Sequence, residues 1–191
     1  MSPPKSARTP ATEVRANLLA AGRRILERDG VAALTVRAVA TKAGVAPMGV
    51  YNHFDGKEGL LNALVTDGFA EFAGLIAATD ADPSTRLLNS GRNYRGFAVA
   101  NPTLYTLMFS MDCEAESEVA ARAFFELVDI VKYGQVAGMI RPGEPEQLAA
   151  QIWACVHGAV ALELASSYPP FIDPSAAYEQ VIRLIARGVA A

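Results

Sequence analysis

Four polar side chains near the N-terminus have the types and spacing needed to contact a nucleic-acid backbone. Thr35, Tyr51, His53 and Lys57 flank a pair of short predicted helices. Hydroxyl, imidazole and ammonium groups donate hydrogen bonds to phosphate oxygens, and such contacts position a protein on DNA. Lys57 falls in the first turn of the next predicted helix, whose free backbone N–H groups also favour an anion. These residues predict a set of phosphate contacts.

The helices that position these side chains are short and closely joined. Thr35 is a good N-cap for a helix that ends at about Ala43, where Gly44 supplies the left-handed residue. Pro47 fits the first turn of a second helix reaching about His53. Two helices joined in this way form a helix-turn-helix unit, whose second helix fits the major groove of DNA. We also expect small Ala40 and Gly44 to let the helices approach closely.

The remaining pattern predicts an all-α fold of about nine helices and no convincing strand. Asp55 and Glu58 form the D-x-x-E pattern of a capping box at the start of a long helix. Apolar periodicity and the breaks at proline and glycine place the other elements. The expected helices cover residues 12–29, 35–43, 47–53, 56–78, 83–100, a short turn through 109, 116–138, 145–167 and 174–188.

Charge divides the 191-residue chain unevenly. Residues 1–60 carry nine Lys and Arg against five Asp and Glu, whereas residues 61–191 carry eight against fifteen. This asymmetry suggests a segment that meets a polyanion, attached to an acidic body that does not. Residues 1–11, with three prolines and two basic residues, predict a flexible basic tail.

Several classes of protein are disfavoured by what the sequence lacks. Cys113 and Cys155 are 42 positions apart and no CxxC pair occurs, so we expect neither a zinc site nor a disulfide-stapled secreted fold. The sequence has no G-x-S-x-G, H-E-x-x-H or phosphate-binding glycine loop, so we expect that the protein is not an enzyme and that it binds no cofactor. Without a signal peptide or a membrane-length apolar run, the expected location is the cytoplasm, with no membrane partner.

The segment LTVRAVATKAGVAPMGVYNHFDGKEGLL, residues 34–61, resembles the DNA-binding signature of the tetracycline-repressor (TetR) family of bacterial regulators. The shared elements are T-V-R, A-G-V, Y-x-H-F and K-E-x-L. Residues 92–109 and 152–164 resemble a C-terminal domain of the Trp-His-Gly type through Trp153, His157 and Gly158. The resemblance implies DNA binding by residues 12–55 and an all-α ligand-binding and dimerisation domain over residues 56–191.

The expected DNA contacts combine the phosphate-facing residues with the second short helix. That helix departs from the family pattern, because Ala46, Pro47, Met48 and Gly49 offer almost no side-chain hydrogen bonds. Base readout then depends on Asn52, on nearby basic residues and on apolar contact with thymine methyl groups. The full expected set is Thr35, Arg37, Lys42, Ala46, Pro47, Met48, Gly49, Tyr51, Asn52, His53 and Lys57.

Aromatic and methionine residues of the body could line a ligand pocket or simply fill the core. The candidate pocket set is Tyr94, Phe97, Tyr105, Met108, Phe109, Phe124, Trp153 and His157. The helix over residues 145–167 is apolar almost all round, so it is either a central core helix or a helix shared with a second subunit. The candidate dimer interface is Ile152, Cys155, Ala159, Leu162, Val181, Ile182, Ile185 and Val189.

These expectations describe a homodimeric, ligand-responsive regulator that binds double-stranded DNA. The expected form is a repressor, released from a palindromic operator by a small, largely apolar inducer. Two-fold symmetry suits a palindrome because each subunit reads one half-site. The alternative is a helical ligand-binding or scaffold protein with weak or lost DNA binding, which the sparse recognition helix keeps open.

Overall fold

Nine α-helices and one short 3₁₀ helix make up the described part of the chain, residues 10–110 and 115–191 of a computed structural model. The helices are α1 Ala11–Asp29, α2 Val36–Ala43, α3 Met48–Phe54, α4 Lys57–Ile76, α5 Pro83–Ala100, α6 Pro102–Met108, α7 Ser117–Val136, α8 Pro145–Leu164 and α9 Pro174–Gly188. No strand occurs in these ranges, so the predicted all-α class is confirmed. Cys113 and most of the predicted basic tail lie outside the described residues.

Proline and aspartate define how the later helices begin. Pro83, Pro145 and Pro174 are the first residues of α5, α8 and α9, as predicted, because proline at this position loses no helical hydrogen bond. The Asp82 and Asp173 carboxylates accept hydrogen bonds from backbone N–H groups in the first turns of α5 and α9. The first helix differs from its prediction: it begins at Ala11, with no side-chain cap from Thr12.

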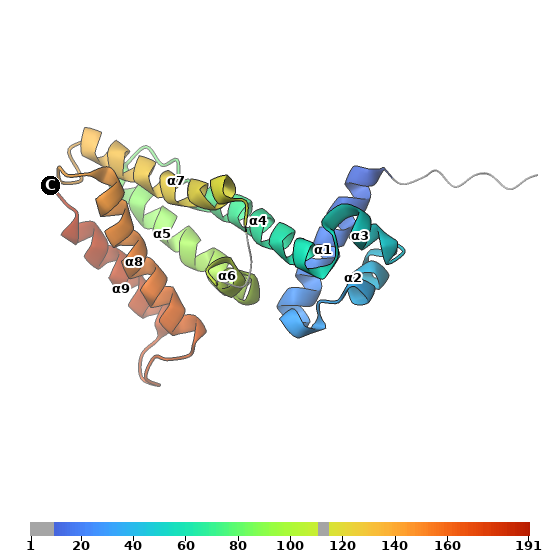
Figure 1. The fold of residues 1–191 in the computed structure, drawn as a ribbon. Coiled ribbons are helices and arrows are strands. Elements are labelled where there is room, and N and C mark those ends of the chain that lie inside the picture. Colours follow the sequence, from blue (N-terminus) through green and yellow to red (C-terminus); the bar gives the residue numbers. More distant parts are fainter. Residues whose placement is uncertain (1–9, 111–114) are drawn as a thin grey trace, which may run out of the picture.

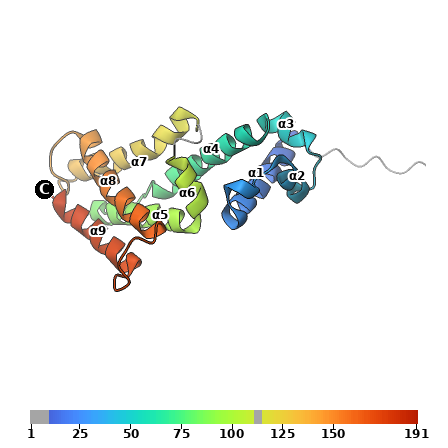
Figure 2. The same ribbon diagram turned by 60° about the horizontal axis from the view of Figure 1, so that its bottom comes forward.

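The helices form two groups joined by one long helix. Figure 1 shows α1, α2 and α3 gathered at one end and α5 to α9 bundled at the other, with α4 running between them. The view in Figure 2 shows the same separation after a rotation. Because α4 runs through both groups and α1 also contacts α6, these helices together fix where the helix-turn-helix unit lies relative to the bundle.

Each group has its own core, and α4 contributes to both. Leu60 and Leu64 in its first turns pack in the N-terminal core with residues of α1, α2 and α3. Further along α4, Phe69, Phe72 and Ile76 pack in the core of the bundle. The boundary predicted between residues 55 and 56 therefore falls before residues that belong to the N-terminal core.

Helix α4 is also long and apolar enough, by length and composition, to cross a membrane. In the structure it packs against α1, α3, α5, α6 and α7. Eight of its residues are buried among those neighbours, from Leu60 to Ile76. Its apolar composition is thus explained by two protein cores, since a helix that is buried on several sides needs apolar residues all round.

Candidate DNA-binding interface and ligand cavity

Helices α2 and α3 form the predicted helix-turn-helix unit. The Thr35 hydroxyl accepts a hydrogen bond from the Ala38 backbone N–H at 3.1 Å and caps α2. Gly44 ends α2 in the left-handed conformation, with a φ of 71°. A Cβ atom at Gly44 would meet no heavy atom within 4 Å. Glycine is therefore favoured there for its backbone angles, and the expected close helix approach at this residue is wrong.

Helix α3 is held by its inward residues. Val50 and Phe54 are buried in the N-terminal core, and the Arg15 guanidinium lies 5.1 Å from the centre of the Phe54 ring. The corner between α3 and α4 is tight, because a Cβ atom at Gly59 would lie 1.6 Å from the Phe54 carbonyl oxygen. Sequence reasoning missed this requirement, since Gly59 lies inside a helix and has no turn signal.

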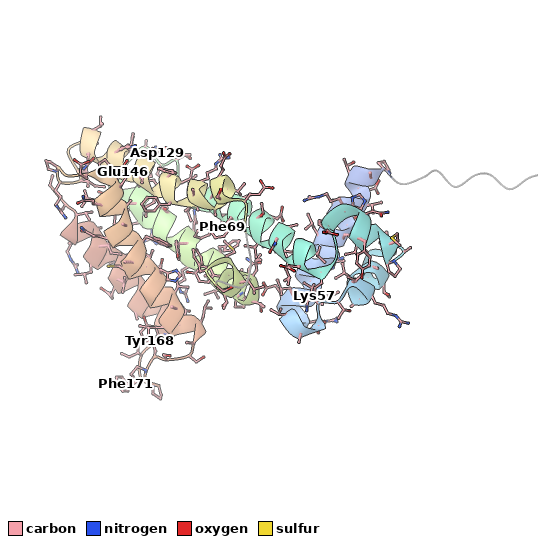
Figure 3. The ribbon with its side chains drawn as sticks, in the orientation of Figure 1. Lys57, Phe69, Asp129, Glu146, Tyr168 and Phe171 are labelled. Atoms are coloured by element: carbon pink, nitrogen blue, oxygen red, sulfur yellow. The ribbon has the colours of Figure 1, made fainter. Side chains whose placement is uncertain are left out.

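The expected capping box at the start of α4 is wrong. Asp55 adopts the left-handed conformation, with a φ of 56°, and it ends α3. Gly56 precedes α4, and no side chain caps that helix. A left-handed residue cannot at the same time take the extended backbone of an N-cap. Lys57 nevertheless lies in the first turn of α4, as predicted, and is its first residue; Figure 3 shows it at the end of α4 nearest α1 and α2.

Most of the residues predicted to contact DNA are exposed to solvent. Gly49 and His53 are half-buried, and the other members are exposed, namely Thr35, Arg37, Lys42, Ala46, Pro47, Met48, Tyr51, Asn52 and Lys57. Met48 and Tyr51 expose 63% and 54% of their surface, and their spacing of three residues places them on one face of α3. The unit therefore presents an apolar recognition-helix start beside a polar rim.

A cavity of about 300 Å³ lies within the helical bundle. Helices α4, α5, α7, α8 and α9 and the residue after α6 all supply lining residues. Of the predicted pocket residues, Tyr94, Phe109, Phe124 and Trp153 line it. Phe97, Tyr105 and Met108 instead lie in the adjoining core. The other lining residues include Phe69, Phe72, Leu87, Ser90, Ile152, Val156, Ile182 and Ile185.

A polar network lies beside this cavity. The Tyr94 and Tyr105 hydroxyl oxygens are 2.8 Å apart, and they lie 3.0 and 2.9 Å from His157 Nδ1. Trp153 Nε1 donates a hydrogen bond to the Tyr94 oxygen at 3.2 Å. A neutral His157 accepts one hydroxyl proton at Nδ1, which leaves the other hydroxyl free to donate to its neighbour.

Burial determines the charge state of this network. It raises the pKa of Tyr94 to about 12 and also raises that of Tyr105. Burial lowers the pKa of His157, because it disfavours the charged imidazolium. At neutral pH the network is therefore uncharged.

Four residues predicted at the dimer interface lie inside the subunit. Ile152, Ala159, Ile182 and Val189 are all at least nine-tenths buried against the other helices of their own chain. This assignment is a correction, because α8 is apolar on nearly all sides and the sequence pattern could not distinguish its inner from its outer face. Cys155 and Leu162 are exposed, and Val181 and Ile185 are half-buried.

A contact between the two groups of helices was missed by sequence reasoning. The Glu27 carboxylate of α1 accepts hydrogen bonds from the backbone N–H groups of Thr103 and Leu104, at 3.2 and 2.8 Å, at the start of α6. Arg23, one turn earlier, donates to Asn101 Oδ1 at 2.8 Å and pairs with Glu71 of α4. The partners are far apart in sequence, so no local signal indicated them.

Two family models match this chain. Residues 18–64 match the model described as bacterial regulatory proteins of the tetR family, and residues 87–185 match the tetracyclin repressor-like C-terminal domain. Two mycobacterial relatives match along most of their length. The HTH-type transcriptional regulators Rv1816 and Rv0681 of Mycobacterium tuberculosis are 24% and 27% identical; the matches cover 91% and 97% of this chain and 91% and 85% of the relatives.

Solved structures have the same fold. A Rhodococcus sp. RHA1 protein of unknown function superposes with a TM-score of 0.81 at 26% identity, covering all of both chains. A TetR family transcription regulator from Marinobacter aquaeolei VT8 superposes with a TM-score of 0.67 at 21% identity, covering 94% of this chain and 96% of that one. Together with the exposed helix-turn-helix unit and the family-model matches, these findings show that the chain is a DNA-binding transcriptional regulator of the TetR family.

Proposed function

We propose that this regulator is a homodimeric repressor that leaves a palindromic operator when a small, apolar ligand enters the bundle cavity. The observation that carries the proposal is the contact between α1 and α6. Helix α6 touches the helix-turn-helix group through Glu27 at its first turn. At its other end, Phe109 lines the cavity. One seven-residue helix thus joins the two sites.

The route from cavity to DNA can be followed in named contacts. Phe109 packs against Tyr105 and Trp153, with ring centres 4.9 and 6.2 Å apart. A ligand that displaces Phe109 shifts α6, and the Glu27 carboxylate moves with the backbone N–H groups it caps. Because α1 packs against α2 and α3, a change in α1 alters the placement of the recognition helix. Linkage then requires that ligand and operator weaken each other's binding equally.

The proposed dimer surface is the outward face of α8 and α9. It is formed by small and apolar residues, and the exposed members are Ala154, Cys155, Gly158, Ala161, Leu162 and Leu184. Alanine and glycine let two helices approach closely, because the interaxial distance depends on the side chains at the contact. Leu184, 62% exposed, lies on α9 beside this surface and would be covered by a second subunit.

The dimer is tested by sedimentation at micromolar concentration. Leu184→Glu should convert the dimer into monomers, because it places a charge in an apolar contact. Val136→Glu is the matched control, since Val136 is 90% exposed on α7, outside this surface. A wild-type chain that sediments as a monomer contradicts the proposal, as does equal dissociation in both variants.

DNA binding is tested by gel shift with the DNA that flanks the chain's own gene. The wild type should bind this fragment more tightly than a random fragment of equal length, and the Asn52→Ala variant should lose much of that preference. Asn52 is the exposed residue of α3 best suited to a base edge. Equal binding to both fragments would contradict sequence-specific repression.

The recognition helix also favours a second candidate function. Ala46, Pro47 and Met48 are exposed but carry no hydrogen-bond donors, as a helical ligand-binding protein with weak DNA binding would allow. Saturable ligand binding, combined with no preference for the flanking DNA, would support this alternative.

A further inference from the structure

The lining of the bundle cavity carries no charge. Among the described residues that surround it there is no Asp, Glu, Lys, Arg or His, and the rings of Phe72, Phe109, Phe124 and Trp153 form much of the wall. A carboxylate or an ammonium group transferred into such a cavity would lose its hydration without gaining a partner of opposite charge. The cavity therefore selects against ionised molecules.

One polar side chain in this wall lacks a partner. Ser90 of α5 is only 5% exposed and lines the cavity. Among the described residues, no hydrogen bond involves the Ser90 hydroxyl group, although a serine inside a helix commonly donates to the carbonyl oxygen four residues earlier. No buried side-chain polar atom among the described residues lacks a partner, so the Ser90 hydroxyl is accessible to the cavity. A ligand that fills the cavity covers this hydroxyl, and a ligand that hydrogen-bonds to it gains affinity over one that does not.

The other polar groups of the wall are already occupied. The Tyr94 hydroxyl, one helical turn beyond Ser90, contacts Tyr105 and His157 and accepts from Trp153 Nε1. This arrangement uses the Trp153 donor and most of the capacity of the Tyr94 hydroxyl. Ser90 is therefore the one lining side chain, within the described ranges, whose hydrogen-bonding groups are free for a ligand.

We propose that the cavity binds an uncharged, mainly apolar molecule through a single hydroxyl or carbonyl group that pairs with Ser90 Oγ. A volume of about 300 Å³ is at the lower end of the range for small-molecule sites, which limits the ligand to a compact molecule. The proposal deepens the proposed function, since it names the class of ligand for the same cavity. Binding itself does not depend on release of DNA.

Three eight-carbon probes distinguish charge from hydrogen bonding: 1-octanol, 1-chlorooctane and octanoate. Trp153 is the single tryptophan of the chain and lines the cavity, so its fluorescence reports occupancy. In the free protein, 1-octanol should bind saturably, and octanoate at neutral pH should bind at least about a hundredfold more weakly, because it must be buried without a partner. Equal affinities for octanol and octanoate would overturn the proposal, as would no binding of any probe.

The role of Ser90 is read from a change in probe selectivity. Ser90→Ala should weaken octanol binding by about two- to tenfold, as expected for one hydrogen bond. It should leave chlorooctane binding unchanged within about twofold, because that probe makes no comparable hydrogen bond. Ser84→Ala, on the same helix but away from the cavity, is the matched control.

The results separate this proposal from the regulatory one. Equal weakening of octanol and chlorooctane by Ser90→Ala would show that Ser90 only shapes the wall, and would overturn the hydrogen-bond assignment. If octanol binds but operator affinity does not change, the result contradicts ligand-induced release of DNA and leaves the proposed ligand class intact. The two proposals can be separated because probe binding is measured on protein without DNA.

Discussion

The contact between Glu27 and the start of α6 should stabilise the protein measurably. Both carboxylate oxygens accept a backbone N–H, from Thr103 and Leu104, and Glu27 is half-buried. Removing a carboxylate that caps a helix costs about 0.5–2 kcal/mol. Two charge-assisted hydrogen bonds are lost here, so we expect Glu27→Ala to lower the free energy of unfolding by about 1–2 kcal/mol.

The assay combines thermal unfolding with hydrogen exchange at a fixed protein concentration, because any self-association would make the melting temperature depend on concentration. For a chain of this size, 1 kcal/mol corresponds to about 2–4 °C. The amide protons of Thr103 and Leu104 should exchange faster in the Glu27→Ala variant. Glu27→Gln should show a smaller effect, since an amide has one oxygen to accept with and no charge.

A control separates this local effect from general loss of charge. Glu118 is an exposed acid in the first turn of α7, and Glu118→Ala should leave exchange at Thr103 and Leu104 unchanged. An unchanged melting temperature with normal exchange at both amides in Glu27→Ala would refute the assignment of Glu27 as the cap of α6.

Four further predictions follow from individual residues. Lys57→Ala should weaken binding to all DNA sequences alike and reduce the slope of log affinity against log salt by about one; a changed sequence preference with an unchanged slope would contradict a phosphate contact. Met48→Ala should lose less affinity on an operator with uracil in place of thymine than on the normal operator, and equal losses would show that Met48 does not contact a methyl group. Burial lowers the pKa of His157 below its unfolded value of 6.5, so the unfolded state binds the proton more tightly. The free energy of unfolding should therefore fall as the pH drops from 6.5 toward the folded pKa, and then level off. The His157→Gln variant should lose this component of the pH dependence. Gly59→Ala should destabilise the protein strongly through contact with a backbone oxygen, whereas Gly74→Ala in the same helix meets open space and should be neutral or stabilising.

Local signals predicted the helices well, because each one has a local cause. Pro83, Pro145 and Pro174 begin three helices as expected, and Thr35 and Gly44 bound α2 as expected. The capping box failed because the D-x-x-E pattern does not state the backbone angle of Asp55. A left-handed Asp55 is set by the tight corner between α3 and α4, which is a tertiary property.

Features that depend on packing between distant segments could not be predicted. The inner face of α8 is decided by its neighbours: Ile152 and Leu162 are equally apolar in sequence, but Ile152 is buried and Leu162 is exposed. In the sequence, Glu27 is an ordinary acidic residue of α1, and its contact with the start of α6 is seen only in the folded structure. Ser90 likewise looks like an ordinary helical serine in the sequence, and only the folded structure places it in the cavity wall.

The sharing of α4 between two cores limits how such regulators can be recombined. A chimera that joins the DNA-reading head of this chain to another body at residue 55 would leave behind Leu60 and Leu64, which complete the head's own core. A junction after Leu64 keeps that core intact, but then Val65 and Phe69 must fit the new bundle. Heads and bodies are therefore interchangeable only if the two halves of α4 keep their rotational register. Each residue inserted or deleted at the junction turns the bundle by about 100° relative to the DNA-reading surface.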